Sequence, residues 1–325
     1  MAIILPQDHP AFSRLQSANV AVRPLAANLD EKAQSNIVKL GFVNLMPREY
    51  LEETVDLLLT RFANGDRDIQ PIFISPEHKA DKGISWAAAK DDVDTVLITG
   101  YAASNLPFEE LCFWPELQTI IRDCDRERKP LLAVCAGAMA VAYETYNIAK
   151  EQAPHKLLGN YDYKTPDGKS IFLATSRNNT LNRYDLLAAL EEHKLTIALE
   201  TTDTPRPEPG IIIDRSRNWV LALAHLEYAY TTCNTYPDFE GQDLHILDYQ
   251  YRRDHNTDSP KYDPALAARV LPPANLELSA AQVHAREAYA EQLMNGWVLR
   301  SLDLKNQKRP QASTSYGRPA AGLRL

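Results

Sequence analysis

The sequence predicts an α/β fold with a mostly parallel central sheet that helices flank on both faces. Two observations predict it. Short apolar runs alternate along the chain with stretches in which apolar residues recur every three or four positions. The short runs are apolar almost throughout, which is typical of parallel strands that helices cover on both sides. Because 45% of the 325 residues are hydrophobic, the chain is expected to bury a sizeable core.

The first half of the chain predicts alternating strands and helices. Strands are expected at 37–43 (IVKLGFV), 68–75 (DIQPIFIS), 94–100 (DTVLITG) and 130–135 (PLLAVC). Pro71 favours an edge position for the second strand, because proline cannot donate a ladder hydrogen bond. Helical spacing of the apolar residues predicts helices at 48–63, at 114–129 and from 136 to about 148.

The second half is expected to add strands and a final helix. Strands are predicted at 170–175, 195–201, 210–216 and 219–228, and the polar link DRSRN indicates that the last two form a hairpin. A helix is predicted at 279–302, with Ser279 as its N-cap. Residues 36–303 therefore form one domain. Residues 1–35 lack a clear period and predict an extended arm with about one helical turn, and the basic segment 304–325 predicts a disordered tail.

Composition excludes several classes of protein. The net charge of −8 and the isoelectric point near 5.5 argue against nucleic acid or an anionic membrane as the main partner. No apolar run approaches the length of a membrane span, and MAIILP is too short for a signal-peptide core. The four cysteines have no regular spacing, so neither a disulfide framework nor a metal site is predicted. We expect a cytoplasmic protein.

Three stretches fall at the carboxyl ends of predicted parallel strands. They are Asn44–Pro47 (NLMP), Gly100 and Cys135. Binding and catalytic groups of such sheets collect beyond this edge. The sequence therefore predicts a functional site there.

Cys135 lies where a predicted strand turns into a helix. A turn of this kind lifts the side chain above the sheet, and the N-terminal end of the helix lowers a thiol pKa. Ala133, Ala136 and Gly137 leave room for a substrate, and the Ala136 N–H is a candidate oxyanion donor. Cysteine statistics alone favour a small apolar core residue instead.

A thiol nucleophile needs a base, and His225 is the candidate. A histidine at the end of a strand is usually an ordinary surface residue. His225 differs because it lies at the end of an apolar strand and Glu227, two residues on, points to the same side of that strand. That spacing allows the carboxylate to orient the imidazole.

AVCAG and the later HLE resemble the Cys–His–Glu arrangement of the class I glutamine amidotransferase-like fold. The wider pattern resembles one branch of that fold, the homoserine O-acyltransferases (homoserine O-succinyltransferases) of methionine biosynthesis. The motifs cover about residues 35–303 in the family's order. They are NLMP, ITG, FWPEL, VCAGAMAVAYETYNI, KLLGNYD, FLATSR, HLEY, YRRD and NGWV.

The resemblance implies a two-step transfer from an acyl-CoA through an acyl-cysteine at Cys135. His225, oriented by Glu227, first deprotonates the thiol and later the hydroxyl of the acceptor. Backbone N–H groups of Ala136 and Gly100 stabilise the oxyanions. CoA is then a co-substrate, no cofactor is bound, and a homodimer is expected.

The resemblance also implies substrate-binding residues. Arg253, in YRRD, occupies the place of the arginine that binds the acceptor's carboxylate. Arg177 either contacts the acceptor or supports the site. Ser104 stands where the family's choice of residue is associated with the acyl donor, and a small residue favours succinyl. Tyr101 stands where the family has a small residue, and its larger side chain is expected to fill part of the space for the acyl group.

Departures from the family's pattern leave alternatives open. Residues 229–248 make a longer connector than the family's and put the acceptor in doubt, so L-serine or a related hydroxy amino acid is an alternative to L-homoserine. A glutaminase or amidase of the same fold is another. Against it, Ala133 replaces the glycine usual two residues before the cysteine. A binding protein with a degenerate site is the non-enzymatic alternative.

Overall fold

The computed structural model describes about three quarters of the chain. The described residues are 2–25, 36–46, 51–63, 65, 67–76, 83–101, 106–201, 204, 206–228, 235–237, 243–245, 267–268, 270, 272 and 277–308. Of the predicted site residues, Ser104 and Arg253 lie outside this set.

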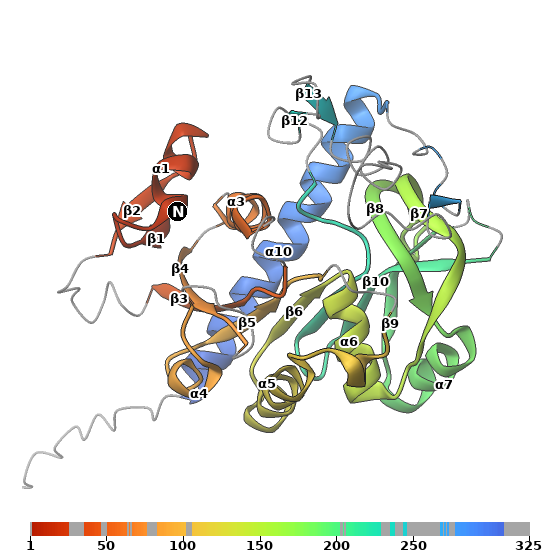
Figure 1. Ribbon diagram of the computed structural model, residues 1–325, viewed down its shortest axis with the longest axis horizontal. Coiled ribbons are helices and arrows are strands. Elements are labelled where there is room, and N and C mark those ends of the chain that lie inside the picture. The colour runs from red at the N-terminus through yellow and green to blue at the C-terminus, as the bar shows by residue number, and fades with distance from the viewer. Residues whose placement is uncertain are drawn as a thin grey trace, which may run out of the picture.

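A large sheet organises the fold (Figure 1). Its order is β2-β1-β4-β3-β5-β6-β11-β10-β9-β7-β8. The first seven strands in this order are parallel to their neighbours, and the remaining pairs are antiparallel. The strands are β1 (Ile3–Leu5), β2 (Val22–Pro24), β3 (Ile37–Val43), β4 (Asp68–Ile74), β5 (Thr95–Ile98), β6 (Leu131–Val134), β7 (Lys150–Lys164), β8 (Ser170–Leu181), β9 (Thr196–Thr201), β10 (Glu208–Asp214) and β11 (Trp219–Ala222).

Helices cover both faces of the sheet, each over its own apolar core. One core contains side chains of α4 (Trp86–Ala89), α5 (Trp114–Glu127), α6 (Ala136–Tyr146) and α7 (Arg183–His193). The other contains side chains of α1 (Pro10–Ser17), α3 (Leu51–Phe62) and α10 (Ala280–Lys308). A short 3-10 turn, η2 (Phe108–Glu110), precedes α5. The predicted mostly parallel α/β fold is confirmed.

The N-terminal residues do not form the expected extended arm. Within 2–25 they form β1, α1 and β2, and β1 pairs with β4 in the main sheet. The His9 side chain accepts a hydrogen bond from the Ala11 N–H at the start of α1, and Pro10 fits the first helical turn. Ile3 and Leu15 are fully buried in the core. Strands β1 and β2 have three residues each, which is too short for the sequence to show an alternating pattern.

The edge position predicted for Pro71 is wrong, because β4 lies between β1 and β3. The Ile69 N–H donates to the Ala2 carbonyl on the β1 side, at the one register pair between these strands. The backbone nitrogen of Pro71, two residues further along β4, points to the same β1 side but lies beyond that pair. Proline has no N–H to donate there, and at this position β4 no longer pairs with β1.

The most consequential element that the sequence did not predict is the hairpin of β7 and β8. It pairs Lys164 with Ser170 at its turn and extends to Leu181. Although β8 is last in the sheet order, the hairpin curls back, so that Ala174 forms an antiparallel bridge with His225 (Figure 1). Gly159 has φ 145° within β7, a conformation that a side chain disfavours and that suits a bent strand. This hairpin brings Ser176 and Arg177 to the site.

Further boundaries differ from the prediction. Strand β11 (Trp219–Ala222) is shorter than the predicted strand 219–228, so His225 and Glu227 follow the strand and do not lie in it. Helix α10 continues to Lys308, so residues 304–308 are helical rather than part of a tail; residues 309–325 lie outside the described set. Within the 229–248 connector, β12 (Thr235–Pro237) and β13 (Asp243–His245) form a two-stranded antiparallel sheet. The predicted hairpin of β10 and β11 is confirmed by their antiparallel register.

Among the described helices, none combines the length and apolar character required to cross a membrane. The same part of the chain holds no group of three or more His, Cys, Asp and Glu side chains arranged to bind a metal ion.

Candidate active site

Cys135 forms a sharp turn between β6 and α6. Its backbone has φ 49° and ψ −117°, a conformation that residues with a side chain rarely adopt. Its N–H donates to the Ala222 carbonyl of β11 at 2.7 Å, and its carbonyl accepts from the Met139 N–H. Neighbouring structure therefore holds a strained residue in place, a situation that clusters at functional sites.

Helix α6 starts in very close contact with β5. A Cβ atom on Gly137 would lie 2.3 Å from the Thr99 carbonyl oxygen and 3.0 Å from Ile98 Cγ2. Only glycine fits, because the nearest atom belongs to the backbone of a central strand. Gly137 thus sets how closely the start of α6, and with it Cys135, approaches the strand ends.

We expect Gly137→Ala to move the start of α6 and to misplace the Cys135 thiol. Overpacking of this kind costs about 1–3 kcal/mol, so the free energy of unfolding in urea should fall by that amount. The rate of Cys135 acylation should fall as well. Gly296→Ala is the matched control, because α10 offers open space around that position and alanine favours a helix. If Gly137→Ala and Gly296→Ala had the same free energy of unfolding and the same acylation rate, the inferred close contact at Gly137 would be contradicted.

The ends of β3 and β5 are joined next to Cys135. The buried Thr99 hydroxyl accepts from the Leu45 N–H at 2.8 Å and lies 3.3 Å from Asn44 Oδ1 and 3.0 Å from the Gly100 carbonyl. A Cβ on Gly100 would lie 3.4 Å from Cys135 Cβ and 3.9 Å from the Ala136 nitrogen. Gly100 therefore lies directly against Cys135 and close to the first residue of α6.

His225 reaches the same place from the second half of the chain. It follows β11, the neighbour of β6 in the sheet, and its N–H donates to the Ala174 carbonyl of β8 at 2.8 Å. The Cys135 Sγ lies 3.8 Å from the Ser176 carbonyl of the same strand. The thiol and the imidazole are thus both positioned against residues 174–176.

The imidazole is oriented by two contacts. Its Nδ1 lies 2.7 Å from Glu227 Oε1, and both side chains are buried. The Tyr228 ring stacks on it with centroids 4.3 Å apart and an interplanar angle of 1°. Nε2 of His225 and Oε2 of Glu227 have no hydrogen-bond partner among the described residues. The nitrogen available for chemistry is therefore Nε2.

Electrostatics favour the ionised pair of thiolate and imidazolium. Burial opposes ionisation of Cys135, but the neighbouring His225 and, to a smaller extent, Arg177 lower the thiol pKa below its ordinary value. Burial also opposes protonation of His225, but Tyr228, Glu227 and Cys135 raise the pKa of the imidazole well above its ordinary value. Cys124 is the contrast, since burial raises its thiol pKa strongly. Cys135 therefore combines a lowered thiol pKa, which is the character of a nucleophile, with partial exposure.

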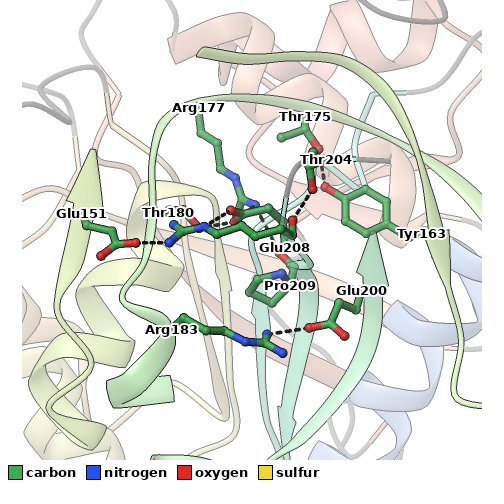
Figure 2. A network of polar contacts seen from close by, with 11 residues as sticks. Glu151, Tyr163, Thr175, Arg177, Thr180, Arg183, Glu200, Thr204, Glu208 and Pro209 are labelled. Carbon is green, nitrogen blue, oxygen red and sulfur yellow. Dashed lines mark hydrogen bonds and ion pairs between the residues drawn. The ribbon is translucent and has the colours of Figure 1, made fainter. Parts of the chain in front are cut away.

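Arg177 lies in β8, directly after Ser176, and its charge acts on Cys135. Figure 2 shows its polar contacts. Its side chain is buried, and its Nη2 donates to Glu208 Oε2 at 3.3 Å and to the Pro209 carbonyl at 3.4 Å. Nε and Nη1 have no acceptor among the described residues. Arg177 therefore links β8 to β10 through one side of its guanidinium group.

The structure thus brings together Cys135, His225, Glu227, Gly100, Ala136 and Arg177, all of which the sequence singled out. It adds three groups that sequence reasoning passed over: the Ser176 carbonyl, Tyr228 and Glu208. Tyr228 lies within the HLEY motif, where its aromatic ring was a usable signal. Glu208 carries no local signal, because its contact with Arg177 depends on the curled hairpin.

Comparisons with known proteins identify the family of this chain. A sequence model of the family described as "HTS: Homoserine O-succinyltransferase" matches residues 2–271. A homoserine O-acetyltransferase of Hyphomonas neptunium is 26% identical over 250 residues, which cover 70% of this chain and 78% of that protein. A homoserine O-succinyltransferase of Pelagibacterium halotolerans is 25% identical over 260 residues, which cover 71% and 78%.

Solved structures show the same fold. A glutamine amidotransferase from Methylobacillus flagellatus superposes with a TM-score of 0.52 at 13% sequence identity, over 81% of this chain and 95% of that one. An identity this low carries the fold alone. The family match spans most of the chain, including the segments that hold Cys135, Arg177, His225 and Glu227. The chain therefore belongs to the homoserine O-succinyltransferase family.

Proposed function

We propose that the protein is an acyl-CoA-dependent O-acyltransferase that transfers a succinyl or acetyl group to the hydroxyl of L-homoserine, a step of methionine biosynthesis. The observation that carries the proposal is the buried group of Cys135, His225 and Glu227 at a strand-to-helix turn, in a chain of this family. Relatives bear the names of both acetyl and succinyl transferases, so the names leave the donor open.

In the first step the Cys135 thiolate attacks the thioester carbonyl carbon of the acyl-CoA. The oxyanion accepts hydrogen bonds from the N–H groups of Gly100 and Ala136. The bond from that carbon to the CoA sulfur then breaks, and the imidazolium of His225 gives its proton to the departing thiolate. The result is an acyl-cysteine, free CoA and a neutral imidazole. The resting thiolate–imidazolium pair, favoured by the pKa shifts above, supplies the proton that this step consumes.

In the second step the acceptor's hydroxyl gives its proton to Nε2 of His225 and its oxygen attacks the acyl-cysteine. The carbon–sulfur bond breaks, and the thiolate–imidazolium pair is restored. Glu227 stabilises the imidazolium and fixes the tautomer through its 2.7 Å contact with Nδ1. Transfer from a thioester to an alcohol oxygen runs downhill, which drives the sequence forward.

The acceptor's α-carboxylate is proposed to bind between two guanidinium groups. Arg253 is assigned to it by family resemblance, and Arg177 supplies N–H groups from the buried side of the site. Ser104 is proposed to line the acyl-donor pocket. We further propose a cytoplasmic homodimer that uses acyl-CoA as a co-substrate and holds no bound cofactor.

The test is direct. The protein is incubated with succinyl-CoA or acetyl-CoA, and the mass of the peptide containing Cys135 is measured. An acyl adduct that disappears when L-homoserine is added, with O-acylhomoserine formed, supports the proposal. Adduct discharge by L-serine and not by L-homoserine would assign the other acceptor. Hydrolysis of glutamine without an acyl adduct would replace the proposal with an amidase.

A further inference from the structure

Glu208 is the centre of a buried polar network next to the active site (Figure 2). Its carboxylate accepts hydrogen bonds from Arg177 Nη2 and from the Thr180 hydroxyl on Oε2, and from Arg206 Nε at 2.9 Å on Oε1. Only 4% of Glu208 and 4% of Arg177 is exposed. Arg206 in turn pairs with Glu151 on β7. The network therefore connects β7 and β8 to the Glu208 carboxylate of β10.

The network holds Arg177 from one side only. Nη2 contacts Glu208 and the Pro209 carbonyl, whereas Nε and Nη1 are buried and have no acceptor in the described part of the chain. A buried ion pair is a poor source of stability, and buried N–H groups without an acceptor carry a desolvation cost. An arrangement built only for stability would have satisfied these groups. One built to bind an anion leaves them available until the anion arrives.

The position of Arg177 fits that purpose. It follows Ser176, whose carbonyl lies 3.8 Å from the Cys135 sulfur. Its positive charge also acts on the thiol, whose pKa it helps to lower after the larger effects of burial and His225. An acceptor whose hydroxyl reaches the acyl-cysteine would bring its carboxylate, a few bonds away, near this guanidinium.

We infer that Glu208 is a positioning residue, which fixes the orientation of the Arg177 guanidinium so that its remaining N–H groups receive the carboxylate of the amino-acid acceptor. The inference rests on the proposed function and extends it to a residue outside the family's motifs as the sequence shows them. Thr180 and Arg206 hold Glu208 from its other sides. The carboxylate is thus fixed before the substrate binds, and binding need not order it.

The test compares the two half-reactions in Glu208→Gln, which keeps the size of the side chain and removes its charge. Loss of a charged hydrogen-bond partner should raise the KM for L-homoserine about tenfold or more. The kcat should change by less, and the single-turnover rate of Cys135 acylation by acyl-CoA, measured without acceptor, should stay near that of the wild type. Glu208→Asp, which keeps the charge, should recover part of the affinity.

Glu200→Gln is the matched control. It removes another glutamate–arginine pair of the same region, with Arg183, and that pair does not touch Arg177. Its KM for L-homoserine should equal that of the wild type. Thermal unfolding of each variant separates misfolding from misplacement, and Glu208→Asp serves as the folded comparison if Glu208→Gln unfolds.

A double variant decides whether Glu208 acts through Arg177. In an Arg177→Gln background Glu208 keeps its contacts with Thr180 and Arg206, so that protein should fold. The added Glu208→Gln change should then raise the KM no further. If the Arg177→Gln and Glu208→Gln substitutions raised the KM for L-homoserine additively, or if Glu208→Gln left this KM unchanged, the inference would be overturned. Absence of transfer by the wild-type protein would instead overturn the proposed function, so the two failures are distinguishable.

Discussion

Cys135→Ala is expected to abolish acyl transfer while the protein stays folded. In the proposed mechanism the Cys135 sulfur carries the acyl group, and loss of a nucleophile from a preorganised site costs about 10⁴-fold or more in rate. Alanine keeps the Cβ atom of cysteine, so the backbone strain at φ 49° is unchanged and little packing volume is lost. The free energy of unfolding should therefore stay close to that of the wild type.

The measurements for Cys135→Ala are the steady-state rate of O-acylhomoserine formation and the mass of the protein after exposure to acyl-CoA. No adduct should form at residue 135. Cys112→Ala is the control, because Cys112 is an exposed thiol between η2 and α5 and its loss should leave turnover intact. Turnover that survives in Cys135→Ala would remove the acyl-cysteine mechanism altogether.

The second large effect is expected for His225→Ala. Burial raises the pKa of Cys135, and the imidazolium is the largest influence that lowers it. Without His225 the thiol pKa must rise, so the thiolate is lost at neutral pH. Loss of general acid–base catalysis costs about 10²–10⁴-fold besides.

The pH dependence of Cys135 acylation tests this reasoning. In the wild type the rate should fall as the pH drops through the lowered thiol pKa, and should persist below the pH at which an ordinary cysteine is protonated. In His225→Ala the same profile should move to higher pH. Glu227→Gln should move the profile less than His225→Ala does, because Glu227 raises the pKa of the imidazole that lowers the thiol pKa but itself raises the thiol pKa. His155→Ala, at an exposed position in β7, should leave the profile in place.

The features that could be predicted from the sequence are those that depend on local residue patterns. Continuous apolar runs predicted the central strands, because burial on both faces leaves no polar positions. The spacing of His225 and Glu227 predicted their contact, which the 2.7 Å distance confirms, although both residues follow β11 in a bent segment and do not lie within the predicted strand. The strand-to-helix turn at Cys135 likewise follows from local chemistry.

The parts of the fold and of the site that could not be predicted depend on contacts between segments far apart in the sequence. Strand β7 contains Pro154 and many charged residues and is largely exposed at its start, so it lacks the pattern of a core strand. Without the β7–β8 hairpin, the proximity of Arg177 to Cys135 cannot be derived. Glu208 is recognisable only once Arg177, Thr180 and Arg206 surround it.

The placement of β11 beside β6 has a consequence for a chain still being synthesised. The sulfur belongs to the part of the polypeptide that leaves the ribosome early, whereas the imidazole that activates it is made much later. Until β11 pairs with β6, the cysteine lacks the base and the neighbouring charge that make it reactive. In an incomplete chain these groups are therefore absent from the cysteine, and completion of the sheet is the event that brings them together.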